Sequence, residues 1–447
     1  MKDRLKIAFT ILGLAVVSLA NAQNNKTLTL NEAIDLSIKN SKQLKINRAK
    51  VEQASAAVKE AIQRRLPDAS FSGSYIRLTN PAIDLKTKNN GNGSGSGNNG
   101  GSTPKVNQAA YGILNASLPI YTGGKIRYGI ESSKYLAHAE ELDAENSKEE
   151  VIENTIEAYI NLYKANAVVK LYEENLIQAQ QRVKDFTNLE KNGLLARNDL
   201  LKVQLQASNV ELSLLDAKNN RELVNVNMDL MLGLSENTIL APDSTIINQT
   251  FSVGTLNEYV QSALKNRKDI EALGLRKQAA DLSVKATRAD RYPALALTGG
   301  YIAADVPKVL TITNAANVGV GVSYNLGSLW KNKAKVEQAE AQSRQLEATQ
   351  ELMNNNIRLQ VNQAYLNWLS SQKKIEVYAK AVEQADENYR IVKNKYNNGL
   401  ATVTDLIEAD VLQLQSNLNY SIAKADAVVV YNQLLQAVGT ISQPRIK

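Results

Sequence analysis

Residues 317–326 read Asn-Val-Gly-Val-Gly-Val-Ser-Tyr-Asn-Leu, a strict alternation of apolar side chains with small or polar ones. Successive side chains of a β-strand point to opposite faces, so this stretch predicts a strand with one wholly apolar face. Segments of about ten residues with this pattern are typical of transmembrane β-barrels. A strand of a soluble sandwich would alternate in the same way, but the sequence contains no further strands that could cover the apolar face.

Three further stretches show the same alternation, at 68–78, 109–121 and 294–304. Aromatic residues gather at helix-side ends of strands, where an interfacial girdle would lie: Tyr121, Tyr292, Tyr324 and Trp330. Four strands cannot close a barrel, because small barrels need about eight strands and an open edge in lipid leaves backbone groups unpaired. The barrel must therefore be shared between copies of the chain, and two, three or four copies all satisfy this argument.

The chain contains two copies of one unit. Leu30-Asn31-Glu32 returns 226 residues later as Leu256-Asn257-Glu258, and Asn192-Gly193-Leu194 returns 206 residues later as Asn398-Gly399-Leu400. The spacing falls by 20 in one place, an Asn/Gly/Ser tract at about 89–102 that has the composition of a flexible insert. An internal repeat of this kind sets the domain organisation. We therefore expect a signal peptide at 1–22, a first repeat at 23–234, a linker at 235–253, a second repeat at 254–440 and a tail at 441–447.

Each copy predicts the same series of elements. A helix (31–66 or 257–291) ends at Pro67 or Pro293, because proline stops helices, and two strands follow. Next come a long helix (126–191 or 331–397), an Asn-Gly-Leu break and a last helix (199–232 or 405–438). Apolar residues recur at a 3,4 spacing along the long helices, which predicts paired coiled-coil helices rather than a globular core.

The N-terminus has the layout of a cleavable secretory signal. Lys2, Arg4 and Lys6 precede an apolar run, and Ala20-Asn21-Ala22 supplies a small-residue cleavage site. Removal of the signal lowers the formal net charge from +7 to +5, a weak bias spread over helices in which acids and bases alternate. Nucleic-acid binding is therefore not expected. The chain has no cysteine, which excludes disulfides, thiol chemistry and an acylated N-terminal cysteine.

The duplication, the strand pairs after Pro67 and Pro293, the segment Ser117-Leu-Pro-Ile-Tyr-Thr-Gly-Gly-Lys125 and the paired Asn-Gly-Leu breaks resemble TolC-type outer-membrane efflux proteins. The resemblance covers essentially the whole chain after the signal. It implies a mostly α fold with membrane β: a homotrimer whose twelve-stranded barrel in the outer membrane continues into a long periplasmic α-helical coiled-coil barrel. It also implies the function of a passive exit duct in a tripartite efflux or type I secretion system, with a periplasmic adaptor and an inner-membrane pump as partners.

The two breaks are the candidate tips of the helical hairpins. Gly193 and Gly399 suit helix-ending residues with positive φ. Leu194 and Leu400 would then be exposed apolar residues at the tips, which favours contact with a partner. By the resemblance, these tips are the part of the chain that an adaptor contacts.

Three acids follow the breaks: Asp199, Asp405 and Glu408. Repeated by symmetry at a narrow tip, these three carboxylates would form an acidic ring that favours cations. The resemblance implies that this tip is the periplasmic entrance and that acids stand at the positions of Asp405 and Glu408. Helix capping is an alternative role, because Thr402-x-x-Asp405 has the form of a capping box. The family's best-studied member has a basic latch residue where this chain has Ala401, which leaves Arg197 as the only nearby candidate latch.

No constellation for catalysis or for binding a cofactor or metal ion is evident. His138 is the only histidine, and the glycines at 91–101 lie in the low-complexity tract rather than in a phosphate-binding loop. We therefore expect no enzyme activity. A secreted or outer-membrane-anchored coiled-coil structural protein or adhesin is the rival interpretation, but it does not explain two rods of equal length per chain with matching reversals.

Overall fold

The computed structural model describes residues 25–79, 106–249, 251, 253–307 and 309–442. The expected signal peptide at 1–22, the tract at 89–102 and most of the expected tail lie outside these ranges. The described residues form two compact units. The sheet unit comprises 51–140 and 273–349, and the hairpin unit comprises 25–50, 141–272 and 350–442.

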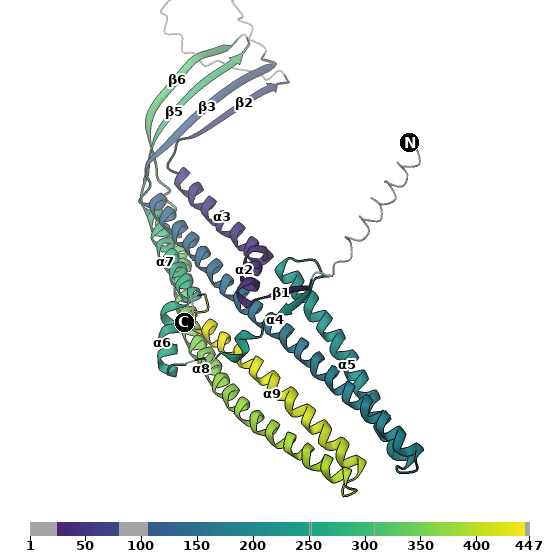
Figure 1. Cartoon of the computed structure of the whole chain (residues 1–447). Coiled ribbons are helices and arrows are strands. Elements are labelled where there is room, and N and C mark those ends of the chain that lie inside the picture. Colours follow the sequence, from purple (N-terminus) through teal and green to yellow (C-terminus); the bar gives the residue numbers. More distant parts are fainter. Residues whose placement is uncertain (1–24, 80–105, 250, 252, 308, 443–447) are drawn as a thin grey trace, which may run out of the picture. The chain divides into compact units, whose positions relative to one another are not determined.

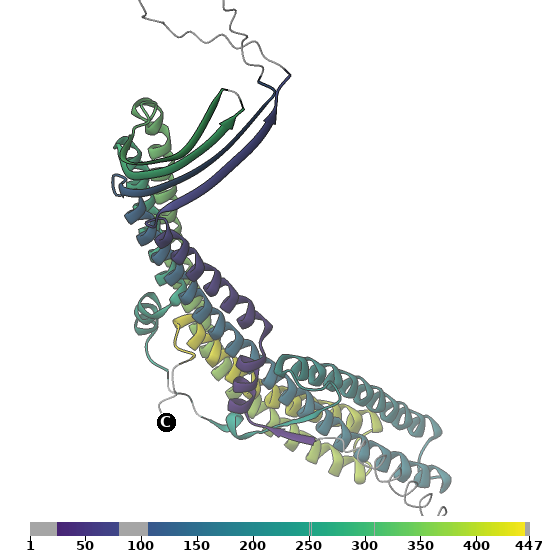
Figure 2. The ribbon, with the colours of Figure 1, turned by 90° about the horizontal axis from the view of Figure 1, so that it is seen from above.

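Four antiparallel strands form the sheet of the sheet unit, in the order β2-β3-β5-β6 (Figure 2). They are β2 (Asp68–Arg77), β3 (Gln108–Tyr121), β5 (Ala294–Val306) and β6 (Leu310–Ser323). The register places Phe71 beside Leu114 and Leu114 beside Tyr301, so that the apolar sides of the strands share one face. Small and polar residues such as Asn115 and Gly300 pair on the other face, as the alternation predicts.

The fourth strand differs from the predicted range of 317–326, because β6 begins at Leu310 and ends at Ser323. Asn314 has a positive φ of 59° and lies at an irregularity in the register with β5. The chain around Asn314 is therefore a bulge within β6 rather than a loop before it. At the other end, the Asn325 Oδ1 accepts a hydrogen bond from the Gly327 N–H at 3.0 Å. The resulting turn ends the strand before Leu326.

Both outer strands of the sheet lack a second partner. Within the part of the chain that the structure describes, β2 pairs only with β3, and β6 pairs only with β5. The apolar face is also uncovered, since Val318 is 83% exposed. A single chain therefore leaves two sheet edges and an apolar surface without contacts.

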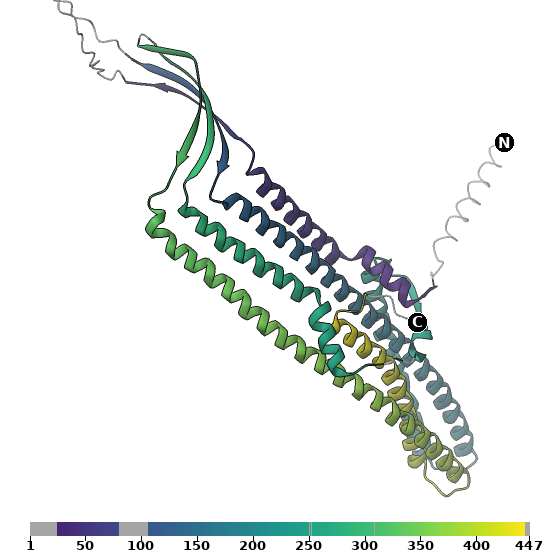
Figure 3. The same cartoon turned by 90° about the vertical axis from the view of Figure 1, so that its left-hand side faces the viewer.

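Four helices enter the sheet unit side by side in the order α3, α4, α7, α8 (Figure 3). They are α3 (Lys42–Gln63), α4 (Lys125–Lys191), α7 (Lys268–Arg288) and α8 (Ser328–Asn397). The short helix η2 (Ala289–Arg291) links α7 to β5. Arg276 of α7 binds Glu140 of α4 at 3.0 Å, and Arg288 binds Glu340 of α8 at 2.5 Å.

The predicted helices at 31–66 and 257–291 are each interrupted. The structure has α2 (Leu30–Asn40) before α3, and α6 (Leu256–Asn266) before α7. Ser41 and Arg267 stand at the interruptions with ψ values of 122° and 125°, outside the helical range. The Ser41 Oγ then accepts the Leu44 N–H at 3.2 Å, which restarts the helix.

Each interruption lies against the C-terminal end of another helix. The Asn40 Nδ2 donates a hydrogen bond of 2.6 Å to the Leu232 carbonyl, at the end of α5 (Arg197–Leu232). The Arg267 Nη1 donates one of 3.3 Å to the Ala437 carbonyl, near the end of α9 (Val403–Val438). The predicted continuous helices are therefore wrong, because these tertiary contacts satisfy carbonyls that α5 and α9 leave unpaired.

In the hairpin unit the helices lie in the order α8, α9, α4, α5 (Figure 1). Lys218 of α5 binds Glu173 of α4 at 2.9 Å, and Lys164 of α4 binds Asp426 of α9 at 2.7 Å. Between α9 and α8, the Gln413 Nε2 donates to the Asp386 carboxylate at 2.8 Å. Helices α5 and α8 are therefore the outer helices of this row.

Two apolar clusters stabilise the hairpin unit. In the first, β1 (Asn25–Leu28) pairs in parallel with β4 (Ile239–Pro242), ahead of η1 (Thr245–Asn248). The buried Tyr159 hydroxyl donates to the Leu28 carbonyl at 2.8 Å and accepts the Asp243 N–H at 2.8 Å. In the second, Trp368 packs near Phe251 and Tyr431. Within the described ranges, none of the helices has the length and hydropathy that crossing a bilayer requires.

Candidate functional site

The first candidate tip joins α4 to α5. Gly193 has a φ of 69°, and the Leu194 N–H donates to the Leu189 carbonyl at 2.9 Å. This is the hydrogen bond of a Schellman motif, which ends a helix at a residue of left-handed conformation. Leu194 is 73% exposed. The motif therefore turns an apolar side chain outward at the point of reversal.

The second candidate tip joins α8 to α9 in the same way. Gly399 has a φ of 74°, and the Leu400 N–H donates to the Lys395 carbonyl at 2.8 Å. A Cβ built on either tip glycine would meet nothing within 4 Å, so backbone conformation rather than space requires glycine there. Leu400 is 76% exposed, close to the 73% of Leu194 at the first tip.

Asp405 caps the N-terminal end of α9. Its carboxylate accepts the Thr402 N–H at 2.8 Å, and the Thr402 Oγ1 accepts the Asp405 N–H at 3.2 Å, which completes the capping box at the start of α9. The hydrogen bond from the Thr402 backbone lowers the pKa of Asp405. Glu408 lies one turn further on the same helix face and is exposed. Both carboxylates therefore remain open to solvent.

Asp199 belongs to a contact between the two tips. It is half-buried in the first turn of α5, where Lys202 binds its carboxylate at 3.2 Å. The same Lys202 ammonium donates to the Thr404 hydroxyl of α9 at 3.3 Å. Burial raises the pKa of the nearby Tyr396, and the charge of Asp199 raises it further. Lys202 was not singled out from the sequence.

The candidate latch Arg197 lies on the first tip. Its Nη1 is 3.4 Å from the Glu190 carboxylate, so its ion pair is made within the α4–α5 hairpin. In the described part of the chain, no ion pair joins Arg197 to the α8–α9 hairpin. The contacts between the two hairpins come from other residues.

An apolar cluster joins the two hairpins near their tips. Phe186 of α4 and Tyr396 of α8 stack with ring centroids 5.5 Å apart. Leu200 of α5 and Leu406 of α9 are buried in the same cluster. The two tips therefore form one packed structure rather than two separate hairpins.

A buried ion pair lies next to this cluster. The Arg182 guanidinium of α4 donates two hydrogen bonds of 3.0 Å to the Asp410 carboxylate of α9, and a third of 3.2 Å to the Tyr389 hydroxyl. Only 10% of the Arg182 side chain and 4% of the Asp410 side chain are exposed. Sequence reasoning missed this pair, although Asp410 follows Val403 and Leu406 in the 3,4 apolar row of α9, where a charge is a signal.

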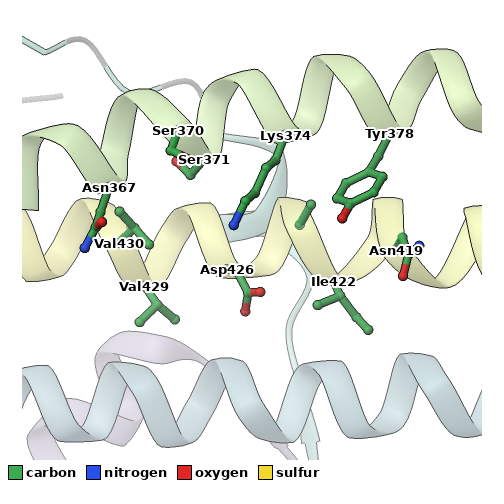
Figure 4. Close-up of a pocket in the computed structure, with 11 residues that line it drawn as sticks. Asn367, Ser370, Ser371, Lys374, Tyr378, Asn419, Ile422, Asp426, Val429 and Val430 are labelled. Carbon is green, nitrogen blue, oxygen red and sulfur yellow. The ribbon is translucent and has the colours of Figure 1, made fainter.

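A separate cavity of about 330 Å³ lies along α8 and α9 (Figure 4). Its lining combines Lys374 and Asp426 with Tyr378 and with the apolar Ile422 and Val429. None of the expected tip residues lines it. Among the described residues, no three His, Cys, Asp or Glu side chains are grouped closely enough to hold a metal ion.

Comparison with known proteins bears on both halves of the chain. The sequence model described as "Outer membrane efflux protein" matches residues 33–234 and 259–440. The toluene efflux pump outer membrane protein TtgC of Pseudomonas putida is 24% identical over 201 residues, which are 43% of this chain and 41% of TtgC. The outer membrane efflux protein BepC of Brucella suis biovar 1 is 21% identical over 353 residues, 77% of this chain and 76% of BepC.

The fold also matches a solved channel structure. The Campylobacter jejuni CmeC outer membrane channel superposes with a TM-score of 0.74 at 21% identity, covering 93% of this chain and 87% of that one. The mostly helical fold with few strands is thereby confirmed. The match to TtgC spans only about two fifths of that relative's length.

Proposed function

The chain belongs to the outer membrane efflux protein family, and from this membership we propose that it is the outer-membrane exit duct of a tripartite efflux or type I secretion system. It would conduct substrates passively from a periplasmic adaptor and an inner-membrane pump to the exterior, without chemistry of its own. The observation that carries the proposal is the sheet with an uncovered apolar face, joined through α4 and α8 to two helical hairpins.

The proposed assembly is a homotrimer that closes one twelve-stranded barrel. In such a ring, the free edge of β6 in one copy pairs with the free edge of β2 in the next, which removes the unpaired backbone groups that lipid does not tolerate. The outer helices of the hairpin unit support the same contact. Exposed leucines at near-heptad spacing mark one side of α5 and of α8: Leu201, Leu205, Leu212, Leu352, Leu359 and Leu366. Two different surfaces that meet in this way generate a closed ring when the rotation between neighbouring copies closes, as the proposed threefold symmetry requires.

The proposed gate is the pair of tips. Asp405, Glu408 and Asp199 would form an acidic ring at the periplasmic entrance, with Leu194 and Leu400 as adaptor contacts. Support comes from the solvent-exposed carboxylates of Asp405 and Glu408 and from the outward leucines. We further propose that the Arg182–Asp410 pair, rather than a residue at Ala401, holds the two hairpins together in the closed state.

Planar-bilayer conductance tests the duct and its entrance together. Asp405→Asn with Glu408→Gln removes two charges, yet the amide of residue 405 can still accept the capping hydrogen bond from Thr402. We expect lower cation selectivity at an almost unchanged melting temperature. Glu211→Gln with Asp216→Asn is the matched control, since both acids are exposed on α5 more than three turns beyond Arg197.

The outcomes separate the parts of this proposal. A wild-type chain that forms no channel would overturn the duct. A channel whose selectivity is the same in both double variants and the wild type would remove the acidic ring and leave Asp405 with its capping role alone. Electron microscopy of the purified protein tests the trimer, which a stable monomer in detergent would contradict.

A further inference from the structure

The four junctions between strands and helices in the sheet unit carry an unbalanced positive charge. The segments 61–68, 122–128, 287–294 and 324–335 contain nine Lys and Arg residues but only two acids, a surplus of seven. The formal net charge of the whole chain is also +7, so the remainder of the chain is neutral in sum. Charge that looks dispersed along the sequence is therefore concentrated at these junctions. Figure 3 shows the places where the helices meet the strands.

Several of these cations are available to a ligand. Arg65, Arg291, Lys331 and Lys335 are exposed, and among the described residues none of the four has an ion-pair partner. Within the junction segments, Asp290 is already bound by Lys125 at 2.7 Å. An exposed cation cluster without compensating acids attracts an anionic surface or ligand.

Exposed apolar side chains accompany the cations. Leu66 follows Arg65, Tyr292 follows Arg291, and Trp330 precedes Lys331; Trp330 is 66% exposed. Aromatic rings and long cationic side chains are the residues that sit at the level of lipid headgroups, with the apolar part toward the hydrocarbon and the charge in the headgroup layer. A soluble polyanion would match the charge but would leave the apolar side chains in water.

We propose that these junctions form a collar that binds the headgroups of anionic phospholipids in the periplasmic leaflet of the outer membrane. This inference rests on the placement of the sheet in that membrane under the proposed function. The collar fixes the depth at which the barrel sits, because the cations stop at the headgroups while the apolar face of the sheet stays in the hydrocarbon. Each cation near an anionic surface favours binding by about fivefold.

Lipid retention tests the collar. The full chain is reconstituted in vesicles of phosphatidylglycerol and phosphatidylethanolamine and extracted with mild detergent, and the retained phospholipid is quantified by mass spectrometry. We expect the retained lipid of the wild type to be enriched in phosphatidylglycerol by about fivefold or more over the vesicles. The enrichment should decrease as salt is raised, because exposed charges are screened.

The variant replaces Arg65, Arg291, Lys331 and Lys335 by Gln and should retain the two lipids in the vesicle ratio. Its matched control should behave as the wild type. The control replaces by Gln two arginines and two lysines of the hairpin unit that are exposed and have no ion-pair partner among the described residues: Arg48, Arg358, Lys170 and Lys184. Equal enrichment in the four-site variant and the wild type, or none in the wild type, would overturn the collar.

A second measurement needs no charge variant. The chain has two tryptophans, and the other one, Trp368, is buried in the hairpin unit. The fluorescence of Trp330 is the part of the emission that is lost in Trp330→Phe. Brominated phosphatidylglycerol should quench it more than the same amount of brominated phosphatidylethanolamine does, and equal quenching would contradict the proposal. Conductance in neutral bilayers separates the two proposals. A wild type that conducts but shows no lipid enrichment would contradict only the collar, whereas a wild type that neither inserts nor conducts would contradict the duct.

Discussion

The ion pair of Arg182 with Asp410 should make the stability of each hairpin depend on the other. Removing one partner of a buried pair costs about 3–5 kcal/mol, because the remaining charge stays buried and unpaired. Arg182→Met should lie at the upper end of this range, since within the described residues the Asp410 side chain makes hydrogen bonds only with Arg182. Asp410→Leu should lie at the lower end, because the Tyr389 hydroxyl still accepts one guanidinium hydrogen.

The double variant distinguishes a paired charge from mere packing. Arg182→Met with Asp410→Leu replaces the pair by two apolar side chains, and such replacements are often neutral or stabilising. We expect it to unfold within about 1 kcal/mol of the wild type, which gives a coupling free energy of about 3 kcal/mol or more.

Urea unfolding in detergent, followed by the loss of helical circular dichroism, measures these free energies. The protein concentration is held fixed, because assembly makes apparent stability depend on it. Lys218 and Glu173 provide the control cycle: their ammonium and carboxylate are 2.9 Å apart, but both side chains are more than 40% exposed, so the coupling should stay below about 1 kcal/mol. Single variants that match the wild type, or a double variant as unstable as the sum of the two, would refute the reasoning.

Two further predictions concern residues at helix C-termini. Burial raises the pKa of Asp229 from 3.8 to about 6. Between these two pH values the folded protein keeps a proton that the unfolded chain has released, so the free energy of unfolding should fall as the pH rises from 3.8 to about 6. Asp229→Asn should abolish that fall and raise the free energy of unfolding at pH 8 by up to about 3 kcal/mol, whereas an unchanged pH profile would exclude a buried proton. Gly439→Ala should lower the melting temperature more than Gly399→Ala: both glycines have a φ of 74°, which costs alanine about 1–2 kcal/mol, but only the Cβ at 439 would press on backbone, 3.2 Å from the Arg267 Cα. Equal losses in thermal unfolding would show that the Arg267 backbone yields freely.

Sequence reasoning predicted the elements that local chemistry determines. The helix ends at Gly193 and Gly399 follow from glycine's access to positive φ, and the common apolar face of the strands follows from the alternation of their side chains. Interruptions at Ser41 and Arg267 could not be found in this way, because neither residue is a glycine or a proline. Their non-helical backbone is stabilised by contacts with α5 and α9, which are distant in sequence.

The candidate site divides along the same line. The capping box of Asp405 is local and was visible as Thr402-x-x-Asp405. The partner of Arg182, in contrast, lies 228 residues away in the chain. The cations of the collar also escaped notice, because each junction contributes only two or three of them and their sum emerges only when the fold brings four junctions together.

The parallel pairing of β1 with β4 bears on the order in which an exported chain folds. Asn25 pairs with Ile239, so more than two hundred residues separate the two short strands. Closing a flexible loop of that length costs roughly 5 kcal/mol in chain entropy, more than a strand pair of four residues can offset alone. The pair can therefore form only after the helices between the two strands have packed and shortened this loop, so in an exported chain β1 docks only once residue 242 is available. Docking of β1 then completes this part of the hairpin unit, and it requires an α4–α5 hairpin that has already formed.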